Sequence, residues 1–197
     1  DEEYAMKAAE NPLVTGIIEK LSVEKNIDMA LKVNPTADKV VAILDDSVTA
    51  DAERKNFYSA EAEYPELEFS EINSSELTTA QLQQAISKVD DKTILIYIVM
   101  SKDGSGKQYT SDQALCMIVD YAKVPVYRMV EAGIGDGLLG GNVVSMYKSG
   151  EIAAQMAMDI ANGTDSAEIN VVKDSPNIYC VDEAVSYTHL TLPTNSR

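Results

Sequence analysis

Continuous apolar runs and one-sided helical patterns alternate along the middle of the chain. Residues 40–44 (VVAIL) and 93–100 (TILIYIVM) are typical of strands buried on both faces of a parallel sheet. Helical patterns are expected at residues 51–63, after the capping-box spacing of residues 78–81, and along residues 115–122. Because strands and helices alternate across short connections, the pattern predicts βαβ units and a parallel sheet.

Three weaker elements complete this unit. Residues 67–72 alternate in the manner of a strand near the edge of the sheet, and residues 124–127 begin the next strand, with Pro125 at its start because proline cannot donate a ladder hydrogen bond. Upstream, Ser22 is expected to cap a helix that ends near residues 34–35. Residues 20–128 are therefore predicted to form one compact α/β lobe.

A different pattern follows residue 128. The glycine-dense strip at residues 133–141 precedes a short strand at 142–146, a helix at 149–162 and a last strand at 169–172. This strand-helix-strand piece is too small to bury its own core, so we expect it to pack on something else. A dinucleotide-binding loop would need its glycines to open a helix, whereas extended chain follows here, so we interpret residues 129–141 as a flexible crossing.

Composition narrows the function classes. A net charge of −16 disfavours binding to nucleic acid or to anionic membranes. Cys116 and Cys180 fit neither a disulfide framework nor a zinc spacing, and whether they form a disulfide is left open. The one histidine, His189, lies in residues 186–197, a tail that departs from the preceding pattern and is interpreted as non-native. A native chain without histidine excludes a Ser-His-Asp triad and histidine metal ligands.

Two short motifs have alternative interpretations. Residues 104–107 (GSGK) suggest a phosphate loop, but the Walker pattern needs more residues before its Gly-Lys pair and a Ser or Thr after it. Asp45-Asp46 suggests the acidic pair of a receiver domain, but the positions after the later strands do not supply that domain's other residues. An ordinary loop and a helix-capping acid pair are the interpretations that we favour.

The order of several segments resembles the ABC-transporter substrate-binding family with the type I periplasmic-binding fold. It is most similar to the versions used as extracellular sensor regions of bacterial histidine kinases and diguanylate cyclases. The resemblance covers roughly residues 10–185. The stretches that carry it are 12–17 (PLVTGI), 34–40 (NPTADKV), 124–127 (VPVY), 133–141 (GIGDGLLGG), 161–163 (ANG) and 175–179 (SPNIY).

The resemblance implies two α/β lobes joined by crossings, with most of the first lobe missing at the N-terminus. Residues 1–19 would be the remnant of lobe 1 and the first crossing, residues 20–128 a complete Rossmann-like lobe 2, and residues 142–185 the return segment of lobe 1. The expected hinge positions are Thr15, Gly16, Gly135 and Gly137.

The resemblance also implies a function. We expect a small-molecule solute to bind in the cleft between the lobes and to close them. The output would reach an ABC permease, or a membrane-linked kinase or cyclase region. The protein would work at the extracellular or periplasmic face, tethered to the membrane in its full length. No catalytic residue, cofactor or metal is expected, and a truncated lobe is expected to self-associate through exposed apolar surface.

Ligands of open parallel sheets lie beyond the carboxyl ends of the strands, which selects three loops of the predicted lobe, at residues 45–49, 101–109 and 128–131. Ser47 would donate to the ligand or cap a helix. Arg128 would pair with a ligand carboxylate bidentately or with Glu131, and Tyr109 would stack on the ligand or pack on the lobe. The candidate ligand-binding residues are Asp46, Ser47, Ser101, Tyr109, Arg128 and Glu131.

Two other classes of function stay open on sequence grounds. One is a small flavodoxin-like or nucleotide-binding α/β enzyme, which would need a phosphate-cradling loop. The other is an oligomerisation or interaction module that uses the acidic face or an exposed lobe surface.

Overall fold

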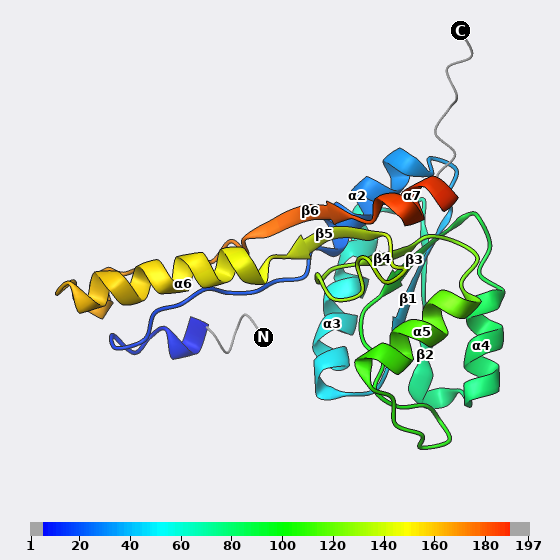
Figure 1. The fold of residues 1–197 in the computed structure, drawn as a ribbon, viewed down its shortest axis with the longest axis horizontal. Helices are drawn as coiled ribbons and strands as arrows, with labels where there is room; N and C mark the ends of the chain where they lie inside the picture. The colour runs from blue at the N-terminus through cyan, green and yellow to red at the C-terminus, as the bar shows by residue number, and fades with distance from the viewer. Residues whose placement is uncertain (1–5, 190–197) are drawn as a thin grey trace, which may run out of the picture.

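The body of the protein is one six-stranded sheet covered by helices on both faces (Figure 1). The structure is a computed structural model and describes residues 6–189. The strand order is β2-β1-β3-β4-β5-β6. The strands are β1 (Lys39–Leu44), β2 (Glu68–Asn73), β3 (Thr93–Tyr97), β4 (Val126–Arg128), β5 (Gly140–Val144) and β6 (Asn177–Val181).

The first five strands run parallel, as the alternation of elements predicts. Every residue of β3 is buried, and β2 lies at the edge of the sheet, which confirms both expectations. β6 pairs antiparallel with β5, with Asn142 opposite Tyr179. The sequence pattern missed β6 as a strand, because three of its five side chains are exposed and its hydrophobic signal is weak.

Two apolar layers hold the helices against the sheet. Alternate side chains of β1 and β3, among them Leu44 and Ile96, pack with Ile27 and Phe57 on one face. The remaining ones, such as Leu95, pack on the opposite face. The first face carries α2 (Val23–Val33) and α3 (Val48–Ser59), and the second carries α4 (Thr79–Ser87) and α5 (Ser111–Tyr121).

The helix starts follow local capping chemistry. The capping box from Thr78 to Gln81 forms as expected and opens α4. Ser47 caps α3, so this helix begins three residues before the predicted start at residue 51. Ser22 precedes α2 but makes no side-chain cap; its hydroxyl instead accepts a hydrogen bond from Asn177 at 2.9 Å.

Residues 133–139 lie in the loop between β4 and β5, and the last two glycines of the glycine-dense strip, Gly140 and Gly141, belong to β5 of the same sheet. β5 begins directly beside β4, with Gly140 paired to Tyr127, and the Leu139 amide donates to the Val126 carbonyl at 2.9 Å. Gly140 has φ +94°, and a Cβ there would collide with the Cys180 carbonyl of β6. The glycine therefore permits close backbone packing, and flexibility is not what this position requires.

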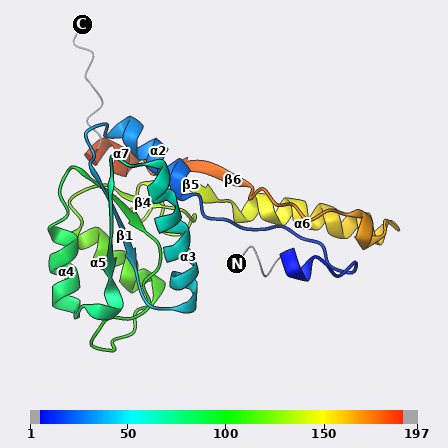
Figure 2. The same cartoon turned by 180° about the vertical axis from the view of Figure 1, so that it is seen from behind.

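The chain leaves the sheet after Val144. α6 (Met146–Ala161) projects to one side of the body beside the N-terminal segment, as Figures 1 and 2 show from opposite sides. Among its residues only Met156 is buried. The helix ends before Gly163, as expected, but it begins after Ser145, which caps it in place of Ser149.

The returning chain lies against the N-terminal segment before it rejoins the body. The predicted strand at residues 169–172 is reduced to a single parallel bridge between Ile17 and Val172. The Ile18 amide donates to the Val172 carbonyl, and the Val172 amide donates to the Gly16 carbonyl, each at 2.9 Å. After β6, α7 (Glu183–His189) contains the first four residues of the tail interpreted as non-native; residues 190–197 lie outside the described residues.

Candidate functional site

A buried carboxylate organises the carboxyl edge of the central strands. Asp45 follows β1 directly and is fully buried. It accepts hydrogen bonds from the Ser47 amide at 2.9 Å and from the Ser101 amide at 2.8 Å, and the Ser101 hydroxyl donates to it as well. Burial alone would raise the pKa of Asp45, but the hydrogen bonds from Ser101 and Ser47 outweigh it and hold the pKa below its ordinary value. Asp45 thus stays ionised and fixes the loops after β1 and β3 to each other.

Asp46 belongs to a more exposed charge cluster at the same edge. Its carboxylate accepts from the Asn73 amide group at 2.8 Å and pairs with Arg54 at 3.2 Å. Arg54 also pairs with Glu71 at 3.0 Å and with Asp51 at 2.8 Å. The cluster joins α3 to the end of β2. The Asp46 carboxylate therefore already has protein partners, Asn73 and Arg54, in the absence of a ligand.

Ser47 and Ser101 both have structural roles. The Ser47 hydroxyl accepts from the Ala50 amide at 3.2 Å and so caps α3, which is one of the two roles considered for it. The Ser101 hydroxyl is directed to Asp45, and the Ser101 carbonyl accepts from the Tyr109 amide at 2.8 Å. Both serines nevertheless lie at the carboxyl edge beside Asp45, where the sequence placed them.

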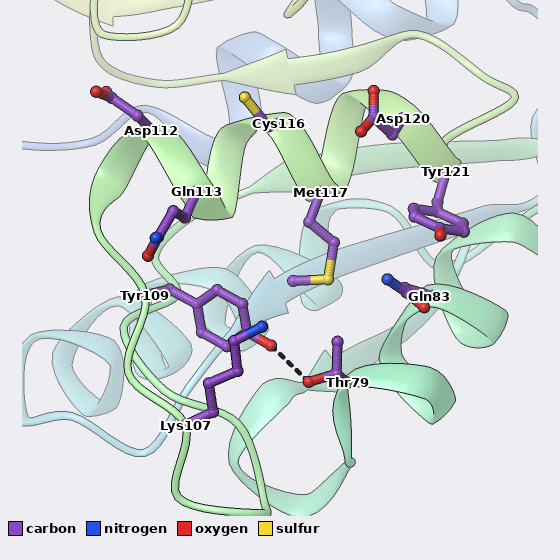
Figure 3. A pocket seen from close by; sticks show the side chains of 10 residues that line it. All are labelled: Thr79, Gln83, Lys107, Tyr109, Asp112, Gln113, Cys116, Met117, Asp120 and Tyr121. Carbon is purple, nitrogen blue, oxygen red and sulfur yellow. Dashed lines mark hydrogen bonds between the residues drawn. The ribbon is translucent and has the colours of Figure 1, made fainter.

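The Tyr109 side chain lies in a groove between α4 and α5. Its hydroxyl donates to Asp103 at 2.9 Å. The same hydroxyl lies 2.8 Å from the Thr79 hydroxyl, as Figure 3 shows. The groove has a cavity of about 420 Å³, and Met117 and Tyr121 also line it. No other candidate residue lines this groove, so the Tyr109 side chain lies apart from those of Asp46, Ser47, Arg128 and Glu131, and it meets Ser101 only through its backbone amide.

The loop that contains the GSGK motif is closed on a side chain of its own. Asp103 is buried and accepts from the Ser105 amide at 2.9 Å, from the Lys107 amide at 3.1 Å and from the Thr79 hydroxyl at 2.6 Å. Burial would raise the pKa of Asp103, but these hydrogen bonds lower it far below its ordinary value. The amides that a phosphate loop would offer to a nucleotide are thus occupied by Asp103, which supports an ordinary loop.

Arg128 ends β4 and crosses to the end of β3. Its Nη1 donates to the carbonyl of Tyr97 at 2.9 Å and to that of Ile98, and its guanidinium lies 4.1 Å from the centre of the Tyr97 ring. Glu131 lies in the loop after β4, partly exposed, and forms no ion pair with Arg128 within the described residues. The alternative of an Arg128–Glu131 pair is therefore wrong for this conformation.

The expected hinge residues fall in two places. Gly135 and Gly137 lie in the loop between β4 and β5, which are neighbouring strands of one sheet, and Gly137 packs on Val119 of α5. Their role as hinge residues stays a prediction. Thr15 and Gly16 lie beside the Ile17–Val172 bridge, where the chain enters and leaves the body.

Tyr97 and Arg54 belong to this edge but were not expected there from the sequence, and Asp45 was expected in the loop at residues 45–49 but not as a contact residue. Asp45 is the first residue after an apolar strand, a position that faces the carboxyl edge, and this signal was available. Tyr97 was hidden within a continuous apolar run. In residues 6–189, no group of three or more His, Cys, Asp or Glu side chains could hold a metal ion, and no helix there is long and apolar enough to span a bilayer.

A family model described as ABC transporter substrate binding protein matches residues 5–189. A comparison with curated protein sequences finds no match.

Several solved structures share the fold. A substrate binding protein with adhesive properties from Clostridium difficile, in its ligand-free, open structure, has 19% identity and a TM-score of 0.70 over 93% of this chain and 60% of its own. A conserved domain protein from Vibrio cholerae has 16% identity and a TM-score of 0.64, covering 92% and 60%. The ABC domain in complex with L-Trp from Streptococcus pneumoniae has 16% identity and a TM-score of 0.63, covering 89% and 59%.

The chain thus spans about 60% of the length of these structures, and its α/β architecture is the periplasmic-binding-like fold that the resemblance implied. Since the family model covers the entire described chain, the protein belongs to the ABC transporter substrate binding protein family.

Proposed function

We propose that the carboxyl edge of β1, β3 and β4 is one wall of a cleft that binds a small solute. The observation that carries this proposal is the convergence of Asp45, Ser101 and Arg128 from three different strand ends. In open parallel sheets this edge is where ligands bind. Membership in a substrate-binding family supports binding as the role of this edge, in preference to catalysis.

We further propose that a second lobe supplies the opposite wall. α6 projects from the body with apolar side chains in solvent: Tyr147 is 70% exposed and Met158 59% exposed. Such a helix face is stabilised when another surface covers it. The solved structures extend well beyond the length of this chain, and their additional part is the candidate for that surface.

The output that we propose is closure of the two lobes around the solute, with Thr15 and Gly16 at the crossing. Closure follows if the solute contacts both walls and thereby favours the closed state. The partner of the closed form would be an ABC permease at the extracellular or periplasmic face of a membrane, as the family name suggests. A kinase or cyclase region is the alternative partner, and it would lie in the same polypeptide.

A titration followed by ¹H–¹⁵N NMR tests the binding site. L-Trp is the first probe, because it occupies one of the similar structures, followed by other amino acids, sugars and nucleosides at millimolar concentration. The chain has no tryptophan, so the fluorescence anisotropy of L-Trp itself gives a second readout without protein background. We expect the shifted amides to cluster at residues 45–49, 98–101 and 128–131.

A matched pair of serine variants sharpens this test. Ser101→Ala removes a hydroxyl that donates to Asp45 and should weaken binding. Ser87→Ala removes a hydroxyl at the far end of α4, where it bonds only the Gln84 carbonyl, and should leave binding unchanged. If no probe shifts the three loops, or if the shifts map to the α4–α5 groove, the proposed cleft wall is wrong.

A further inference from the structure

The hydrogen-bonding capacity of Arg128 is only partly used by the protein. Its Nη1 is held by the carbonyls of Tyr97 and Ile98, and its Nε donates to the Ala132 carbonyl at 3.4 Å, a long hydrogen bond. Its Nη2, with two N–H donors, has no partner within the described residues. Within the described residues, the buried side-chain nitrogen and oxygen atoms without a hydrogen-bond partner are those of Thr15 and Ser149. Nη2 is not one of them, so it is accessible to solvent. Because the guanidinium is rigid and planar, Nη2 lies beside Nη1 at the carboxyl end of β3 and β4.

The positive charge of Arg128 also lacks a counter-charge. No carboxylate of residues 6–189 lies within ion-pair distance of it, although 32 of the 197 residues in the chain are acidic. Arg54 of α3, by contrast, pairs with Glu71, Asp51 and Asp46. Burial lowers the pKa of the Arg128 guanidinium, and arginine stays protonated in proteins all the same. A partly desolvated cation without an anion is costly, which favours binding of an anion that the described chain does not supply.

We propose, on the basis of the binding function above, that Arg128 determines ligand specificity by pairing through Nη2 with a carboxylate group of the solute. The two carbonyls and the Tyr97 ring hold the guanidinium in place before the solute arrives. A rigid donor at a partly desolvated site loses little conformational entropy on binding, so its contacts contribute fully to affinity. Since Nη1 and Nε are already engaged, the carboxylate meets one nitrogen and not the two-nitrogen fork expected from the sequence.

The surroundings favour a singly charged group. One unpaired guanidinium balances one carboxylate. A phosphate dianion would bring a second negative charge close to Asp45, Asp46 and Glu131, which are acidic groups of the same edge, in a chain of net charge −16. We therefore assign a monocarboxylate end to the solute at this position, and phosphorylated solutes are expected to bind worse than their carboxylate counterparts.

Arg128 also stabilises the fold, and the test must separate the two roles. Its Nη1 satisfies two carbonyls at the end of β3, a contact that would exist without any ligand. A chemical change in the ligand leaves this contact within the protein intact. Pairs of probes that differ only in the charged group, L-Trp against L-tryptophanamide and acetate against acetamide, therefore examine the specificity role in the unmodified protein.

The chain has three arginines, Arg54, Arg128 and Arg197, so their side-chain NMR signals can be resolved and assigned. We expect carboxylate probes to shift the Arg128 signal and amide probes to leave it in place. The Arg54 signal should stay unchanged with both, because its carboxylate partners are already present. Charge-assisted hydrogen bonds of this kind correspond to an affinity ratio of about ten- to a hundredfold between acid and amide.

Variants complete the experiment. Arg128→Gln should remove the acid-over-amide preference, and Arg128→Lys, which retains the charge, should keep part of it. Lys123→Gln removes an equal charge from the exposed connection that precedes β4 and should keep all of this preference. If Arg128→Gln does not fold, the comparison of acid and amide probes on the unmodified chain still tests the carboxylate assignment.

Equal affinity for acid and amide, tighter binding of inorganic phosphate, or binding of a neutral sugar or nucleoside at the three loops would overturn the carboxylate assignment and leave the cleft intact. Absence of binding by every probe would overturn the cleft and the assignment together.

Discussion

Two buried aspartates shape the loops at the carboxyl edge of the sheet. Asp45 and Asp103 each accept several hydrogen bonds from backbone amides and hydroxyls, and both are held ionised in a protein interior. A carboxylate that collects donors in this way fixes loops more firmly than loop backbone alone can. The first aspartate places Ser101 at the candidate site, and the second draws Tyr109 away to the α4–α5 groove.

The Asp103 network makes stability depend on pH. Its pKa is lowered in the folded state, so its contribution to stability is present above the unfolded pKa of about 4 and is lost as pH falls through the folded value. We expect Asp103→Asn to be less stable than the unmodified chain at neutral pH, with the difference shrinking in acid below about pH 4. Urea unfolding at neutral and acid pH measures this.

The exposed Asp120, near the C-terminal end of α5, serves as the control: Asp120→Asn should change stability little at either pH. A difference between Asp103→Asn and the unmodified chain that stays constant with pH would contradict the role assigned to Asp103.

At the scale of elements, glycines serve opposite needs in β5 and α6. Gly140 adopts φ +94° and lies against the β6 backbone, whereas Gly150 is within a helix with open space around it. The sequence pattern treated the glycine-dense strip as flexible because glycine permits both mobility and close packing. Only the position of β6, distant in sequence, distinguishes the two uses.

Replacing these two glycines by alanine should have contrasting effects. Gly140→Ala should lower the free energy of unfolding by at least about 2 kcal/mol, because the side chain meets the Cys180 carbonyl and the φ angle disfavours any L-residue. Gly150→Ala should not lower the free energy of unfolding and should raise it by up to about 1 kcal/mol, since alanine has a higher helix propensity than glycine and the added methyl group meets open space. Chemical denaturation followed by circular dichroism compares them. Equal stability of the two variants would mean that β5 and β6 do not pack as described.

At the scale of the whole molecule, an acidic protein carries a projecting helix, α6, with exposed apolar side chains. The chain has a net charge of −16, yet α6 carries several large apolar side chains that are exposed. This helix projects beyond the body of the protein (Figure 2). Its exposed apolar residues are Met146, Tyr147, Met158 and Ile160. Charge repulsion and apolar attraction between copies therefore oppose each other, and salt weakens only the first.

We expect this chain to self-associate as salt rises from about 0.1 to about 1 M, where the screening length falls from about 10 to about 3 Å. Sedimentation velocity measures the change in mass. Met158→Lys should suppress the association, because it places a charge within the apolar face of α6. Gln84→Lys adds the same charge on the exposed side of α4 and should not suppress it. Association that is equal in both variants would show that α6 is not the contact surface.

Much of the candidate site followed from sequence because strand ends can be located without a structure. The apolar runs before Asp45 and Ser101 are long and β-rich, and parallel strands bring their carboxyl ends to one edge. The roles of individual residues did not follow. Which of Asp45 and Asp46 turns inward, and whether Arg128 meets Glu131 or a backbone carbonyl, depends on how neighbouring loops close over each strand.

The sequence by itself determined the α/β class, the succession of β1 to β4 and their helices along the chain, and the family resemblance. The reason is that hydrophobic periodicity, helix capping and apolar runs are local properties of the chain. Tertiary structure alone decided that β5 and β6 extend the same sheet, that α6 projects uncovered, and that Arg128 ends without an acidic partner. Each of these depends on contacts between segments distant in sequence, such as Tyr127 with Gly140 and Gly141 with Cys180, and no local pattern encodes them.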